Sequence, residues 1–141
     1  MFANKTYKQQ FIMKPSTIVC LVLSANFLVS CGYKKEAKEV TQDFFSAIKN
    51  NKEEKMVELY PEVGNLQNYY KSDTIIVKEV KELEDKKYSV ALTNKFTNGF
   101  GKNTESDIII YTKPKDDKKP SDGYVIYDSK GLCNLSDDPI Y

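Results

Sequence analysis

The stretch that most restricts the fold is residues 88–96, in which large apolar side chains alternate with smaller or polar ones. The apolar members are Tyr88, Val90, Leu92 and Phe96. A period of two residues is typical of a β-strand that buries one face and leaves the other in water. We therefore expect an antiparallel sheet that needs a covering layer on one face only.

Three further segments, rich in β-branched residues or bounded by turn residues, predict additional strands. They are residues 74–83, 104–112 and 123–129. The connections between the four strands are a polar turn, the glycine-containing stretch "NGFGKN" and a charged loop with two prolines, at 84–86, 98–103 and 113–123. Hairpin-type connections join antiparallel neighbours, so the sequence predicts a four-stranded antiparallel meander.

Two helices are expected before the strands. Over residues 36–50 apolar side chains recur at spacings of three and four: Ala37, Val40, Phe44, Ala47 and Ile48. Asn51, with Glu54 three residues later, matches a capping box for a second, shorter helix that Pro61 stops. Helices followed by hairpin-connected strands indicate an α+β domain, with the long helix and the short helix packed on a curved meander.

The composition excludes several classes of function. All 21 basic residues are lysine, and the chain contains no arginine, histidine or tryptophan. Catalysis by Ser-His-Asp or Cys-His pairs and zinc sites with imidazole ligands are thereby excluded. Without arginine, and with a formal net charge of only +1, the chain lacks the basic groove of a nucleic-acid-binding protein.

We expect no cofactor and no metal site. Three acids in the charged loop could suggest calcium: Asp116, Asp117 and Asp122. The spacing of a calcium loop is missing, and four lysines in the same loop oppose a bound cation. A solvated loop is the simpler interpretation.

Residues 1–30 predict a secretory signal. Three lysines precede an apolar run of about eleven residues at 18–28, and no acid occurs before Glu36. The run is too short for a membrane-spanning helix, which needs about 20 residues. Met13 opens a segment that is a complete signal of ordinary length by itself, so Met13 is an alternative start.

The apolar run ends in Leu28-Val29-Ser30-Cys31, which resembles the lipobox of bacterial lipoproteins. The resemblance implies that the thiol of Cys31 receives diacylglycerol, that the signal is cut before it and that the new amine is acylated. Two or three acyl chains anchor a protein firmly, whereas one binds only marginally. The alternative is an ordinary residue near a normal signal-peptidase site.

This interpretation divides the chain into a signal peptide at 1–30, a short polar tether carrying the lipid at 31–35 and a domain at 36–141. The protein is then expected in the bacterial cell envelope, membrane-anchored and either periplasmic or on the cell surface. Cys133 would be the only free thiol of the mature chain, so we expect it to pack rather than to form an intramolecular disulfide.

The order of elements, with "DFFSAIKNNKEEKMVELYPEV" leading and "YVIYDSKGL" closing, resembles a second family over residues 36–133. This is the cystatin-like, nuclear-transport-factor-2-like domain of small bacterial lipoproteins. The resemblance implies a sheet that curls around the helix to form a conical cavity, in a superfamily whose members catalyse, bind or scaffold. The Gln-x-Val-x-Gly pattern of protease-binding cystatins is absent.

Enzymes with such a cavity tend to place an acid on a strand, facing inward. The candidate acids are Glu79, Asp107 and Asp128, and the candidate hydrogen-bond donors are Tyr88, Tyr111, Tyr124 and Tyr127. Asp107 and Asp128 stand near strand ends, where acids commonly face water. We therefore expect a non-catalytic binding or interaction module with an envelope protein as partner. The alternative is a small-molecule-binding protein or a weak enzyme that uses the conical pocket.

Overall fold

The computed structural model describes residues 15–63 and 71–132, with side chains from Cys31 onward. The chain separates into two units, residues 1–30 and residues 31–141, and all four strands belong to the second. Its helices are α1 (Pro15–Lys49), which begins in the first unit, and α2 (Glu53–Leu59). Its strands are β1 (Thr74–Glu82), β2 (Tyr88–Thr97), β3 (Asn103–Pro114) and β4 (Tyr124–Lys130).

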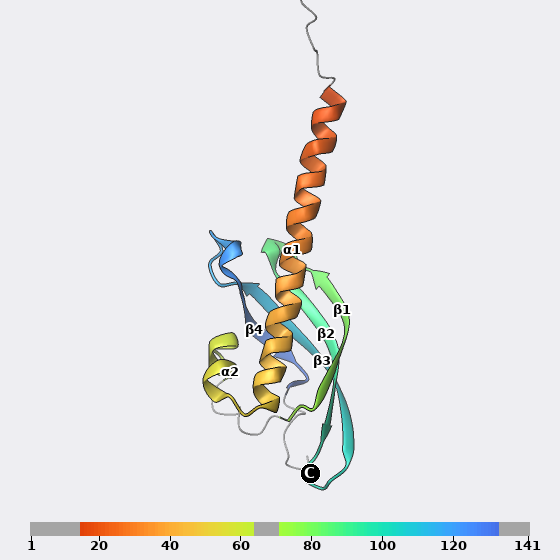
Figure 1. Cartoon of the computed structure of the whole chain (residues 1–141), viewed down its shortest axis with the longest axis vertical. Helices are drawn as coiled ribbons and strands as arrows, with labels where there is room; N and C mark the ends of the chain where they lie inside the picture. Colours follow the sequence, from red (N-terminus) through yellow and green to blue (C-terminus); the bar gives the residue numbers. More distant parts are fainter. Residues whose placement is uncertain (1–14, 64–70, 133–141) are drawn as a thin grey trace, which may run out of the picture. The chain divides into compact units, whose positions relative to one another are not determined.

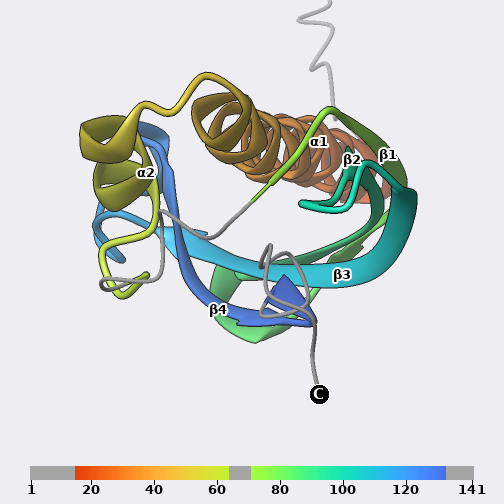
Figure 2. The same ribbon diagram turned by 90° about the horizontal axis from the view of Figure 1, so that it is seen from below.

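The predicted fold class is confirmed. The strands form one antiparallel sheet in the order β1-β2-β3-β4, and the described part of the second unit packs its two helices on one face of that sheet (Figure 1). The sheet curves, and the helices lie on its concave side (Figure 2). Short 3₁₀ turns, η2 (Glu84–Lys86) and η3 (Pro120–Asp122), lie in the β1–β2 and β3–β4 connections.

The core lies between α1 and the concave face of the sheet. The predicted alternation in β2 holds, because Tyr88, Val90, Leu92 and Phe96 are all buried. They pack with Ile108 and Ile110 of β3, Tyr124 and Ile126 of β4, and the apolar side of the helices: Ala37, Val40, Phe44, Phe45, Ala47, Ile48, Met56 and Leu59. Burial of this apolar surface is the main driving force for the fold.

Two buried positions in β2 are polar, Thr93 and Asn94, and Asn94 is the deeper of the two. Asn94 is fully buried, and its side-chain amide donates a 2.9 Å hydrogen bond to the carbonyl of Lys71 while its oxygen accepts one of 2.6 Å from the hydroxyl of Ser72. A buried amide is tolerated only when such partners replace water. The segment that leads into β1 supplies both of them.

The first helix starts earlier than the sequence indicates. Residues 31–35, expected to form a polar tether, are helical and belong to α1. The weakest helix former among them is Gly32, which costs about 1 kcal/mol relative to alanine. The ring of Tyr33 packs on Tyr124, with 6.2 Å between ring centroids, and so holds this turn of the helix on the domain.

The predicted capping box at Asn51 is wrong. Asn51 has a left-handed φ of 51°, and the N-cap of α2 is Lys52, which has no side-chain cap hydrogen bond. The N–H of Asn51 bonds to the carbonyl of Ile48, and that of Lys52 to the carbonyl of Ala47. This pattern is a Schellman motif, so Asn51 ends α1 instead of starting α2, in a conformation that asparagine tolerates.

Two β-bulges interrupt the ladders. In β1 the register shifts between Val77 and Glu79, which leaves Lys78 as the extra residue. In β4 the partners of Tyr111 and Thr112 are Asp128 and Ile126, which leaves Tyr127 as the extra residue. A bulge re-aims the side chain that it carries. Both of these side chains take part in the clusters on the convex face described below.

Candidate functional site

The structure divides the predicted pocket residues between the two faces of the sheet. Tyr88 and Tyr124 lie on the concave face, where both are buried with their ring centroids 5.9 Å apart. Asp107 and Tyr111 lie on the convex face, because the neighbouring Ile108 and Ile110 point into the core. The described structure therefore does not bring the predicted acids and tyrosines together in one cavity under the sheet.

Tyr124 is a buried hydrogen-bond donor. Its hydroxyl donates to the backbone carbonyl of Lys86 at 2.9 Å. Burial raises the pKa of Tyr124 well above its usual range, and the nearby Tyr88 and Glu36 raise it further. The phenol therefore stays protonated at all physiological pH values, which suits a structural donor and not an acid–base catalyst.

Asp107 is exposed and paired, in contrast to the inward-facing acid that the family resemblance implies. Its Oδ1 accepts a 2.8 Å bond from the ammonium of Lys78 and a 2.7 Å bond from the hydroxyl of Thr93. The pKa of Asp107 is held below its usual value, mainly by the hydrogen bond from Lys78. The hydrogen bond from Thr93 and the charge of Lys78 lower it further. A carboxylate stabilised in this way is a poor general base at neutral pH.

The other two acids also face solvent. Glu79 is exposed directly after the β1 bulge. Asp128 is exposed near the end of β4, where its Oδ1 accepts a 2.8 Å bond from the N–H of the adjacent Ser129. None of the three predicted acids therefore pairs with the buried Tyr124; the acids that act on it are Glu36 of α1 and Glu82 at the end of β1.

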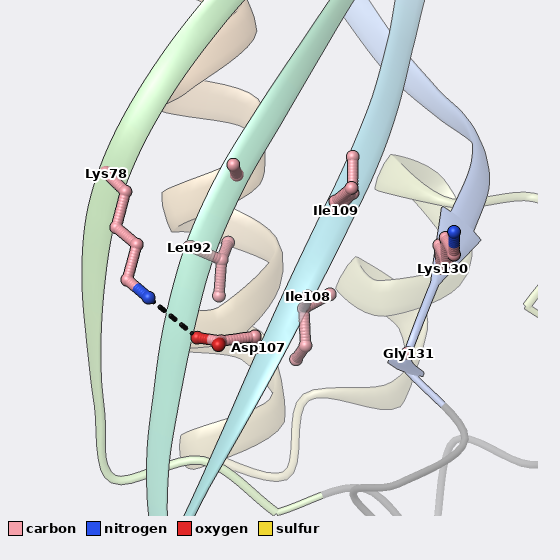
Figure 3. A pocket seen from close by; sticks show the side chains of 8 residues that line it. Lys78, Leu92, Asp107, Ile108, Ile109, Lys130 and Gly131 are labelled. Atoms are coloured by element: carbon pink, nitrogen blue, oxygen red, sulfur yellow. Dashed lines mark hydrogen bonds and ion pairs between the residues drawn. The ribbon is translucent and has the colours of Figure 1, made fainter.

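A hollow of about 380 Å³ lies on the convex face of the sheet (Figure 3). Its lining comes from all four strands and from the residue after β4: Lys78, Ala91, Leu92, Asp107, Ile108, Ile109, Lys130 and Gly131. The ion pair between Lys78 and Asp107 spans β2 along one side, as Figure 3 shows. The lining is otherwise mainly apolar, with Lys130 as a second cation.

Gly131 closes this hollow and could be no other residue without strain. Its φ is +87°, and a Cβ placed on it would lie 2.7 Å from the carbonyl oxygen of Asp107. The close approach lets the chain leave β4 directly against β3. Gly131 is not among the site residues predicted from the sequence, although its place in "SKGLC" after a predicted strand indicates a special backbone conformation.

A second group on the convex face, here termed the tyrosine–lysine cluster, consists of Tyr111, Tyr127, Lys87 and Lys113. The rings of Tyr111 and Tyr127 are 6.3 Å apart, and the ammonium groups of Lys87 and Lys113 each lie 5.8 Å from the Tyr127 ring centroid. Cation–π attraction holds both lysines near one ring. A half-buried aromatic surface bordered by two cations suits an anionic or aromatic partner.

Cys31 is exposed, and it is a free thiol at the first position of the second unit. The side chains of Leu28, Val29 and Ser30, the rest of the lipobox, are outside the described set, as is Cys133. The exposed thiol stands on a helix that packs on the domain from Tyr33 onward. A group attached to Cys31 would thus be close to the domain surface.

Within residues 15–63 and 71–132, no helix is long and apolar enough to cross a membrane. Nor does this part of the chain gather three or more acidic, cysteine or histidine side chains in a metal-binding arrangement. In comparisons with known proteins, no family model, curated protein or solved structure matches the chain significantly.

Proposed function

We propose that the protein is a lipoprotein of the bacterial cell envelope, anchored through a lipid on Cys31, whose domain is a non-catalytic binding module. The sequence at 28–31 supports the anchor, and so does the exposure of Cys31 at the start of the second unit. Three acyl chains on this residue would hold the protein at a membrane, since each buried methylene contributes about 0.8 kcal/mol.

The observation that carries the binding role is the filling of the concave face of the sheet. Phe44 and Phe45 of α1 are buried there, packed edge to face at 5.6 Å. These rings belong to one core cluster with buried residues of β2, β3 and β4, so the side of the sheet that would form a conical pocket is occupied by the protein's own core. Partners then bind the outer surface, where the tyrosine–lysine cluster offers aromatic area and two cations.

The hollow beside Lys78 and Asp107 supports the second candidate, binding of a small molecule. Its volume of about 380 Å³ lies within the range of ligand sites, about 300 to 1,000 Å³. A ligand for it would be mainly apolar and carry one anionic group for Lys130. This candidate replaces the conical pocket with a site on the opposite face of the sheet.

The anchor is tested with Cys31→Ser in the full-length protein in cells. We expect the variant to remain unprocessed or to leave the membrane fraction, since the side chain no longer accepts the lipid. Cys133→Ser is the matched control, and it should be processed and retained like the unchanged protein. Unchanged processing and membrane retention of Cys31→Ser would refute the anchor.

The binding role is tested by crosslinking the native lipidated protein in cells, followed by pull-down and mass spectrometry. A reproducible envelope partner should be lost in Tyr127→Ala and kept in Val57→Ala, which alters an apolar side chain exposed on α2. A partner retained by both variants would remove the tyrosine–lysine cluster from the interface. A small molecule that co-purifies with the protein, and is lost in Lys130→Ala, would favour the second candidate.

A further inference from the structure

We infer that α1 holds the domain directly against the bilayer in one orientation, with the η2 turn and the β3–β4 loop facing the lipid headgroups. The surface in question, here termed the proximal rim, consists of Tyr33, residues 84–87 and residues 115–119. This inference rests on the proposed lipid on Cys31 and adds the geometry of the attachment.

The link between the lipid and the domain is very short. Only Gly32 separates Cys31 from Tyr33, and two residues span about 7 Å even when fully extended. Tyr33 is fixed on the domain by the ring of Tyr124 at 6.2 Å and by the ammonium of Lys86 at 5.9 Å. A lipid on Cys31 therefore cannot let the domain swing away from the membrane.

The same contacts identify the part of the domain that lies beside Cys31. The hydroxyl of Tyr124 binds the carbonyl of Lys86, so the η2 turn stands next to Tyr33. A shared hollow brings Asp117 of the β3–β4 loop beside Asp85, Lys86 and Lys87. Figure 1 shows both connections at the same end of the sheet, beside the N-terminal end of the part of α1 that covers it.

The opposite end of the domain is the turn between β2 and β3. Residues 31–49 of α1 rise by about 27 Å. At the far end of the helix Lys49 donates to the carbonyl of Asp73, whose carboxylate accepts from the N–H of Thr97. The turn that follows Thr97 extends further, and it carries Phe100, 69% exposed.

The length of the link also decides what occupies the proximal rim. A folded protein is thicker than about 7 Å, the reach of two residues, so none fits between this surface and the membrane. The occupant is the bilayer itself. Tyr33 has the amphipathic ring that favours the headgroup region.

The charges of the proximal rim are mixed. Lys86 and Lys87 stand beside Glu84 and Asp85 in the η2 turn, and Lys115, Lys118 and Lys119 beside Asp116 and Asp117 in the loop. The rim therefore has no strong field of one sign, and the short link, not anionic lipid, must set the orientation.

The test uses the lipidated protein in phosphatidylcholine vesicles, with one fluorescent label and an acceptor dye on the lipid headgroups. In a Cys133→Ser background the label is placed by Lys118→Cys on the proximal rim or by Lys102→Cys at the far end. Both lysines are exposed, and neither side chain bonds to another residue of the described ranges 31–63 and 71–132. We expect several-fold stronger energy transfer from position 118, unchanged when phosphatidylglycerol is added.

A third variant inserts ten glycine and serine residues between Gly32 and Tyr33, a flexible link of about 17 Å. It should still float with the vesicles but lose most of the difference between the two labels. Equal transfer from both positions without the insertion would overturn the inference, and so would a difference that survives the insertion or needs anionic lipid. Failure of the unmodified protein to float would instead refute the lipid anchor.

Discussion

The hydroxyl of Tyr124 donates a 2.9 Å hydrogen bond to the carbonyl of Lys86 and so ties β4 to the turn between β1 and β2. In the sheet, β3 separates β4 from β2, the strand that follows this turn. The ring of Tyr124 also contacts Tyr33 at 6.2 Å and Tyr88 at 5.9 Å. One side chain thus joins the start of the domain's helical layer, the sheet and the η2 turn.

Replacing Tyr124 with phenylalanine should lower the free energy of unfolding by about 1 kcal/mol, the usual net value of one hydrogen bond. The ring contacts remain, so the loss measures the hydroxyl alone. Urea denaturation provides the measurement. Tyr127→Phe is the control, since among the described residues Tyr127 makes ring contacts but no hydrogen bond, and it should change stability by less than about 0.5 kcal/mol. Equal losses in both variants would contradict the role given to the bond.

Lys86→Gly should stabilise the protein. Lys86 has a φ of 58° and follows Asp85 at 56°, so two side-chain-bearing residues stand in the left-handed region. Such a residue costs about 1–2 kcal/mol. Against this stand the entropy cost of an added glycine, about 0.5 kcal/mol, and the loss of a cation–π contact of about 0.5 kcal/mol, since at 5.9 Å the ammonium of Lys86 is at the limit of that interaction. We expect a net gain of about 0.5 kcal/mol in thermal or urea denaturation.

Lys87→Gly is the matched control for this substitution. Lys87 has an extended backbone, with φ −82° and ψ 155°, so a glycine at this position relieves no backbone strain. The control should therefore destabilise the protein. Stabilisation by both substitutions, or by neither, would show that the backbone of the turn is not what limits stability.

Gly131→Ala should be much more harmful than Gly101→Ala. Both glycines have positive φ, +87° and +74°. A Cβ at Gly131 would also lie 2.7 Å from the carbonyl oxygen of Asp107, whereas nothing lies within 4 Å of one at Gly101. We expect losses of about 1 kcal/mol at Gly101 and more than 2 kcal/mol at Gly131, measured by urea denaturation. Similar losses would mean that β3 yields to the added methyl group.

Asp107→Asn should reduce the loss of stability in acid. The pKa of Asp107 is lowered in the folded protein, so its ionised form stabilises the fold above the ordinary value of 3.8. That contribution disappears as the pH falls from about 3.8 through the lower folded pKa. Denaturation midpoints between pH 5 and pH 2 should fall less steeply in the variant.

The control for the acid experiment is the double variant Lys78→Gln with Asp107→Asn. It should show the same shallow dependence on pH as Asp107→Asn alone, because the partner of Lys78 is already neutral. A variant profile parallel to that of the unchanged protein would remove Asp107 from the groups that link folding to protonation.

The fold could be predicted because its signals are local. The period of two in 88–96, the helical spacing in 36–50 and the turn residues between strands each report one element. The convex-face site could not be predicted in this way. Ile108, Ile109 and Ile110 give no alternation, so only the pairing of Ile108 with Leu92 shows that Asp107 faces outward. The placement of Lys78 and Tyr127 depends on the two β-bulges. Bulges arise from the pairing between strands and leave no local pattern in the sequence.

The buried amide of Asn94 has a consequence for how the strands choose their alignment. A slip of β1 along β2 by two residues would keep every apolar side chain on its own face, so hydrophobic burial hardly opposes it. It would, however, carry Ser72 and the carbonyl of Lys71 away from Asn94. An amide left without partners in the core costs about 1–3 kcal/mol. The hydrogen bonds of Asn94 therefore fix the register of β1 on β2. They disfavour the sheet in which β1 is shifted by two residues.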